Sequence, residues 1–65
     1  MKKKELEKKY FILLLKEMRL SLSYIKNNQR NRLHVNDEIN ILNLERFLDD
    51  FIEKEMDELE EMKGE

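Results

Sequence analysis

The sequence contains no cysteine, no proline and no tryptophan, and its single glycine is residue 64. Without cysteine the chain can form neither a disulfide bond nor a thiolate metal site. Because neither proline nor an internal glycine interrupts the chain, its mixture of 43% charged and 40% apolar residues favours long helices over strands. A chain of 65 residues forms at most one domain with a small core, so packing against another chain is a common source of stability.

Long hydrophobic runs are also absent. The longest run, YFILLL at residues 10–15, follows a lysine-rich start and is ended by Lys16 and Glu17. It is shorter than the ~7–15 residues of a signal-peptide core and far shorter than the ~20 residues of a membrane-spanning helix. We therefore expect a soluble cytoplasmic protein with no signal peptide and no membrane anchor.

The apolar residues of 10–25 fall on two faces of a helix rather than on one. The first face has 4-3-4-3 spacing, is thickened by Leu14, and contains Phe11, Leu15, Met18, Leu22 and Ile25. The second face, which we call the outer seam, contains Leu6, Tyr10, Leu13, Leu20 and Tyr24 and is interrupted by Glu17. Two apolar faces on one helix require two helical surfaces to cover them.

A second helix has one apolar face, and its remaining surface is acidic. We expect helices at about 4–28 and 37–62, with a connection at about 29–36 and an N-cap at Asn36 or Asp37, so that residues 1–65 form a single helical hairpin. The apolar face of the second helix contains Ile41, Leu44, Leu48, Phe51, Ile52, Leu59 and Met62, and Glu55 interrupts it. The predicted acidic face contains Glu45, Asp49, Glu53 and Asp57, with Glu60 beyond them.

The two halves of the chain carry opposite charge, which favours an antiparallel hairpin. Residues 1–34 contain 10 Lys/Arg and 3 Asp/Glu, whereas residues 35–65 contain 3 and 12. A turn near Arg32 pairs residues whose numbers add to about 66. The apolar pairs of this register are Ile25–Ile41, Leu22–Leu44, Met18–Leu48, Leu15–Phe51 and Leu14–Ile52, and its ion pairs are Lys8–Glu58, Lys9–Asp57 and Lys16–Asp50.

This register covers the first apolar face of the first helix and leaves the outer seam uncovered. A long exposed apolar stripe usually marks an interface. We therefore predict a homodimer in which two first helices face each other through the outer seam, so that the all-α hairpin becomes a four-helix bundle. A heterologous protein partner at Leu6, Tyr10, Leu13, Leu20 and Tyr24 is the alternative use of the same seam.

Residues able to support catalysis or bind a metal are sparse. His34 is the only histidine and lies in the connection, while Ser21 and Ser23 have no adjacent base. Glu45, Asp49, Glu53 and Asp57 form a line along one helix face, whereas calcium and magnesium sites need convergent oxygen atoms. We interpret this face as solvated, and we expect no cofactor and no metal. A row of carboxylates that imitates a phosphate backbone at a basic protein site is the alternative.

The basic residues of the chain could in principle bind a nucleic acid or a membrane surface. Lys26, Arg30, Arg32 and His34 predict a basic tip, so an RNA-binding hairpin dimer is one alternative function. The acidic second helix would screen the basic first helix, and no exposed aromatic platform accompanies it. Lysines beside an apolar face also suit an anionic lipid surface, but the second helix already offers that face a partner.

The hairpin also resembles a known family. Leu15, Arg19, Leu22 and Ile25, together with Leu44, Leu48, Asp49 and Ile52, are similar to the small two-helix aspartyl-phosphate phosphatases that act on sporulation response regulators in bacilli. The family signature in the second helix is Ser-Gln-Glu-Leu-Asp. Residues 45–49 read Glu-Arg-Phe-Leu-Asp, so Leu48 and Asp49 match it and the Ser-Gln pair is replaced. The resemblance implies Asp49 as the functional residue of such a phosphatase.

From these observations we expect a small regulator or inhibitor that is not an enzyme and that docks on another protein through helix–helix contacts. A response-regulator phosphatase is the competing class.

Overall fold

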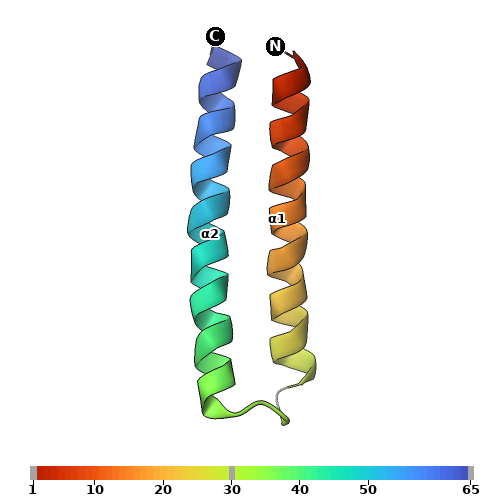
Figure 1. Ribbon diagram of the computed structural model, residues 1–65, viewed down its shortest axis with the longest axis vertical. Coiled ribbons are helices and arrows are strands. Elements are labelled where there is room, and N and C mark those ends of the chain that lie inside the picture. The colour runs from red at the N-terminus through yellow and green to blue at the C-terminus, as the bar shows by residue number, and fades with distance from the viewer. Residues whose placement is uncertain (1, 30, 65) are drawn as a thin grey trace.

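The computed structural model describes residues 2–29 and 31–64, and these form an antiparallel pair of helices (Figure 1). Helix α1 is Lys2–Asn28 and helix α2 is Val35–Gly64. The connection lies at one end of the pair, and the ends of both helices that are far from it lie together at the other (Figure 1). The molecule is a rod of 48 × 15 × 11 Å. The predicted all-helical hairpin is confirmed, whereas the four-helix bundle needs a second chain and stays a prediction.

The two helices meet at a connection made without special backbone geometry in its described residues. The Gln29 amide donates to the Ile25 carbonyl at 2.9 Å and continues the helical pattern at the end of α1. The Glu38 amide donates to the His34 carbonyl at 3.0 Å, so α2 begins at Val35, two residues before the expected start. None of the described residues has a positive φ, so the turn needs no left-handed residue among them.

The core consists of five buried apolar side chains in the described part of the chain. Ile12 and Leu15 come from α1, and Ile41, Leu48 and Ile52 come from α2. Leu22, Phe51 and Leu59 are half-buried and pack against the main cluster of this core. Four of the five core residues lie on predicted inner positions, but Ile12 does not. The contact face of α1 is therefore rotated by part of a turn from the predicted one.

The rotation has a visible consequence for the predicted inner face of α1. Phe11, Met18 and Ile25 are 40%, 55% and 41% exposed. The row that faces α2 instead advances by 4-3-4 residues through Lys8, Ile12, Leu15 and Arg19 and continues to Lys26. In this row the apolar Ile12 and Leu15 lie between the charged Lys8 and Arg19. The predicted assignment of Met18 and Ile25 to the hairpin core is therefore wrong.

Among the described residues, no helix has an apolar stretch long enough to cross a membrane.

Candidate functional site

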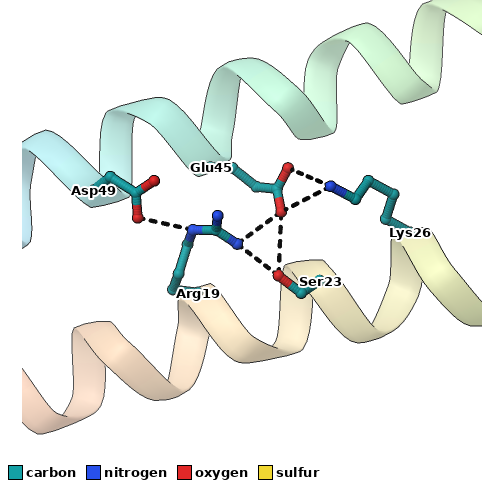
Figure 2. A network of polar contacts seen from close by, with 5 residues as sticks. All are labelled: Arg19, Ser23, Lys26, Glu45 and Asp49. Atoms are coloured by element: carbon teal, nitrogen blue, oxygen red, sulfur yellow. Dashed lines mark hydrogen bonds and ion pairs between the residues drawn. The ribbon is translucent and has the colours of Figure 1, made fainter.

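A polar cluster joins the two helices on one flank of the hairpin and comprises Arg19, Ser23, Lys26, Glu45 and Asp49 (Figure 2). We call it the ionic cluster. Arg19, Ser23 and Lys26 project from α1 at spacings of four and three residues, so they share one helix face. Glu45 and Asp49 lie one turn apart on α2 and project toward them (Figure 2).

Glu45 is the centre of this cluster. Its Oε2 lies 2.7 Å from Arg19 Nη1 and accepts a hydrogen bond from Ser23 Oγ at 3.2 Å. Its Oε1 accepts a hydrogen bond from Lys26 Nζ at 3.1 Å. The Glu45 residue is only 4% exposed. The prediction that Glu45 lies on a solvated acidic face is therefore wrong, because two cations and a hydroxyl of α1 compensate its burial.

The surroundings of Glu45 act on its ionisation in opposite directions. Burial raises the pKa of the Glu45 carboxyl, but hydrogen bonds from Lys26 and Ser23 and the charges of Arg19 and Lys26 outweigh this effect. The net result is a pKa below the ordinary value of 4.5. Glu45 is therefore ionised at neutral pH and has little capacity to act as a general acid or base there.

Asp49 lies at the solvent edge of the same cluster. Its Oδ1 accepts a hydrogen bond from Arg19 Nε at 2.9 Å, while its side chain remains 56% exposed. Arg19 thus bridges two carboxylates of α2, and its side chain is held in one orientation by both. The structure thus brings Arg19 and Asp49, which lie 30 residues apart in the sequence, into direct contact.

A second charged group spans the helices near their other end. Lys8 Nζ lies 2.8 Å from Glu55 Oε1 and 3.7 Å from Glu58 Oε2. A hydrogen bond with Glu58 and one from Lys8 lower the pKa of Glu55, and the hydrogen bond to Glu55 raises the pKa of Lys8. The predicted Lys8–Glu58 pair is confirmed. The ion pairs found within residues 2–29 and 31–64 do not include Lys9–Asp57 or Lys16–Asp50.

The outer seam is exposed along the whole of α1. The five residues are 51–69% exposed, namely Leu6, Tyr10, Leu13, Leu20 and Tyr24. The hairpin itself therefore leaves this apolar stripe available.

A second apolar surface lies on the flank opposite the ionic cluster. Apart from Phe47, its residues are ones that the sequence pattern predicted to lie in the hairpin core. We call it the two-helix apolar face, and it contains Phe11, Leu14, Met18, Ile25, Leu44, Phe47 and Phe51. The Phe11 and Phe51 rings meet edge to face across the helices with centroids 5.7 Å apart, and Phe47 and Phe51 do so at 6.0 Å. These aromatic contacts place the exposed apolar rows of α1 and α2 on the same side of the hairpin.

The remaining sequence candidates do not converge on a catalytic or metal site. Glu53 and Asp57 are exposed and lie away from Glu45, and His34 is exposed in the connection. The Ser21 hydroxyl donates to the Glu17 carbonyl at 3.1 Å. In the described residues, no group of three or more His, Asp or Glu side chains is placed to hold a metal ion.

Comparison with known proteins adds no assignment. No protein-family model matches the chain, and no match was found among curated proteins or among solved structures.

Proposed function

We propose that this chain is a non-enzymatic regulator or inhibitor that binds another protein through the outer seam of α1. The observation that carries the proposal is the exposure of five large apolar side chains on one face of one helix. Leu20 and Tyr24 are 69% and 67% exposed, and Leu6 and Tyr10 are both 63% exposed. An exposed apolar stripe of this kind on a small hairpin is typical of a protein interface.

The chemistry of the seam favours a helical partner. Leucines and tyrosines spaced by three and four residues present a ridge that fits the groove of another helix or an apolar cleft between two helices. Tyr10 and Tyr24 combine a large apolar ring with a hydroxyl that stays in contact with water at the edge of an interface. Glu17, between them, would set the register by requiring a polar partner at that position.

The ion pairs of α1 weigh against RNA binding. Lys8, Arg19 and Lys26 are basic residues that a nucleic-acid surface would use, and all three are bound to carboxylates of α2. Releasing them for phosphate would leave Glu45 and Glu55 without their partners.

Affinity capture from native cells tests the proposal. The bait is the purified hairpin, and the comparison variant is the double substitution Leu13→Glu with Leu20→Glu in the outer seam. Val35→Glu with Ile39→Glu is the matched control, because these apolar residues are 72% and 49% exposed and lie on α2. We expect a protein that is retained by the wild type and the control but lost with the seam variant. Equal retention by all three would contradict the proposal.

A second candidate function is hydrolysis of an aspartyl phosphate, and it is favoured by the geometry of Asp49. The carboxylate is 56% exposed and is oriented by Arg19 Nε at 2.9 Å. An oriented, accessible carboxylate can position a water molecule for attack on a phosphoryl group.

Incubation with an aspartyl-phosphorylated response regulator separates the two functions. A phosphatase shortens the lifetime of the phosphoryl group and loses this effect in Asp49→Ala. A binding protein that is not an enzyme leaves the lifetime unchanged, which is the outcome we expect.

A further inference from the structure

We propose that a second copy of this chain covers the two-helix apolar face, and that each α1 then lies against the partner's α2 in an antiparallel four-helix bundle. The inference is independent of the outer seam and of any target protein that binds there. It concerns a surface to which both helices contribute, and it replaces the outer seam as the site of homodimerisation.

The two-helix apolar face extends along both helices. Phe11, Leu14 and Met18 lie at successive turns of α1, Ile25 lies two turns beyond them, and Met18 is 55% exposed. Its exposed members from α2 include Leu44 and Phe47, at 51% and 64%. An open groove of about 380 Å³ runs between the helices beside Met18, Leu22 and Leu44. A second hollow of about 450 Å³ lies along α2 and is lined by Phe47 and Phe51 together with Asp50 and Lys54. Side chains of a packed helix would fill both depressions.

The total surface of the hairpin indicates how much area a partner must cover. The chain exposes 5643 Å². A compact folded monomer of 8.1 kDa is expected to expose about 4,500 Å². The excess of about 1,100 Å² exceeds the ~800 Å² that each partner contributes to a typical stable interface. One further hairpin on one face is therefore enough to account for the excess.

Only two symmetric ways exist to stack two such hairpins face to face. A two-fold axis parallel to the helices sets each α1 beside the partner's α2, and these neighbours are antiparallel. A two-fold axis perpendicular to the helices and parallel to the plane of the hairpin sets α1 beside the partner's α1 and α2 beside the partner's α2.

The charges of the helices choose between the two arrangements. Helix α1 contains eight Lys/Arg and three Glu, a formal charge of +5, whereas α2 contains three Lys/Arg and eleven Asp/Glu, a formal charge of −8. With the two-fold axis parallel to the helices, basic and acidic helices alternate around the bundle, so that every neighbouring pair is oppositely charged. With the perpendicular axis, the two basic α1 helices lie side by side and so do the two acidic α2 helices, which is unfavourable at low salt.

The parallel axis also defines which residues meet. A rotation about an axis parallel to the helices preserves each residue's height along the bundle, so Met18 lies beside the partner's Phe47 and Leu14 beside the partner's Phe51. The outer seam faces the outer corner of this bundle, because its residues lie about 140–180° around α1 from Leu15 and about 80–160° from Met18, on the side away from both α2 helices. Each dimer would then present two copies of the seam to target proteins.

Cross-linking of mixed single-cysteine chains tests the arrangement, because the wild-type chain has no cysteine. Chains carrying Met18→Cys and chains carrying Phe47→Cys are refolded together and oxidised, and mass spectrometry identifies the mixed product. A disulfide requires Cα atoms within about 7 Å, so only directly facing residues react. Chains carrying Leu13→Cys mixed with the Phe47→Cys chains are the matched control. Helix content by circular dichroism shows that each variant folds.

We expect the Met18→Cys and Phe47→Cys chains to form the mixed disulfide as the main cross-linked species, and the control mixture to form none. Cross-linking of Leu14→Cys chains with Met18→Cys chains instead would show α1 against α1 and overturn the arrangement. Cross-linking of Leu13→Cys chains with Leu20→Cys chains would show that the homodimer forms through the outer seam. If the variants fold but no mixture forms a disulfide, the proposal that a second copy covers the two-helix apolar face is wrong.

Discussion

Arg19 Nη1 and Glu45 Oε2 lie 2.7 Å apart across the hairpin, and the Glu45 side chain is only 5% exposed. The pair occupies inner positions that apolar residues would fill in a simple amphipathic hairpin. Replacing a buried pair by apolar residues is often neutral for stability, so its main effect is to specify which residues face each other. A shift of α2 along α1 by one turn would separate Glu45 from its partners.

Removing the charge of Glu45 should destabilise the hairpin. Glu45→Gln leaves Arg19 and Lys26 without a buried carboxylate, but these side chains are 29% and 37% exposed and can turn toward water. We therefore expect a loss of about 1–2 kcal/mol in the free energy of unfolding, measured by urea titration at neutral pH. Glu53→Gln is the matched control on the exposed face of α2 and should change stability little. An equal effect of both substitutions would contradict the description of the ionic cluster.

Acid should weaken the hairpin. Glu45 and Glu55 both have a pKa below the ordinary value of 4.5 in the folded state. Their stabilisation is therefore fully present above pH 4.5 and is lost as the pH falls through the folded-state values. Urea titrations at fixed protein concentration and decreasing pH should show a falling free energy of unfolding below pH 4.5. Glu45→Gln should reduce the steepness of this fall, and a rise in stability in the same range would be inconsistent with the pKa directions.

Charge reversal should distinguish Lys8 from its neighbour Lys9. Lys8→Glu places three carboxyl groups together and should lower the urea midpoint, most strongly at low ionic strength. Lys9→Glu should have a smaller effect, because the ion pairs of the described residues include Lys8 but not Lys9. Adding Glu55→Lys to Lys8→Glu should recover part of the loss. Additive effects of these two substitutions would show that they do not interact.

Adjacent apolar residues of α1 should respond differently to truncation. Ile12 is 5% exposed, whereas Leu13 is 51% exposed. Ile12→Ala should cost about 2–4 kcal/mol through lost packing, which is a large share of the stability of so small a chain. Leu13→Ala should cost much less in the isolated protein and act on target binding instead. Thermal or urea unfolding of the two variants measures the difference, and equal costs would contradict the rotated contact face.

The sequence predicted the antiparallel hairpin and most of its core, because these depend on apolar spacing and on the opposite charges of the two halves. Leu15, Ile41, Leu48 and Ile52 were all on predicted inner positions. The rotation of α1 was missed because pattern analysis assigns charged residues to the solvent side. Arg19 and Glu45 face inward because each compensates the other, which is a property of the pair and is not visible in either helix alone.

One signal in the sequence could have revealed the rotation. Glu55 interrupts the apolar face of α2, and a charge on an inner face requires an opposite charge across from it. The predicted register set Lys8 within one turn of the position facing Glu55. If Lys8 is placed opposite Glu55, helix geometry turns Ile12 toward α2 and Met18 away from it. The two-helix apolar face could then have been predicted from the sequence.

Sedimentation equilibrium at micromolar concentration tests most directly whether a second copy covers the two-helix apolar face. We predict that the wild type has twice the 8.1 kDa mass of one chain. Leu13→Glu with Leu20→Glu in the outer seam should retain that mass, whereas Met18→Glu with Phe47→Glu should give monomers or unfolded chain. A wild-type mass of 8.1 kDa would contradict the proposal that a second copy covers the two-helix apolar face. It would also be contradicted if the outer-seam substitutions dissociated the dimer while the Met18→Glu, Phe47→Glu variant remained a stable dimer.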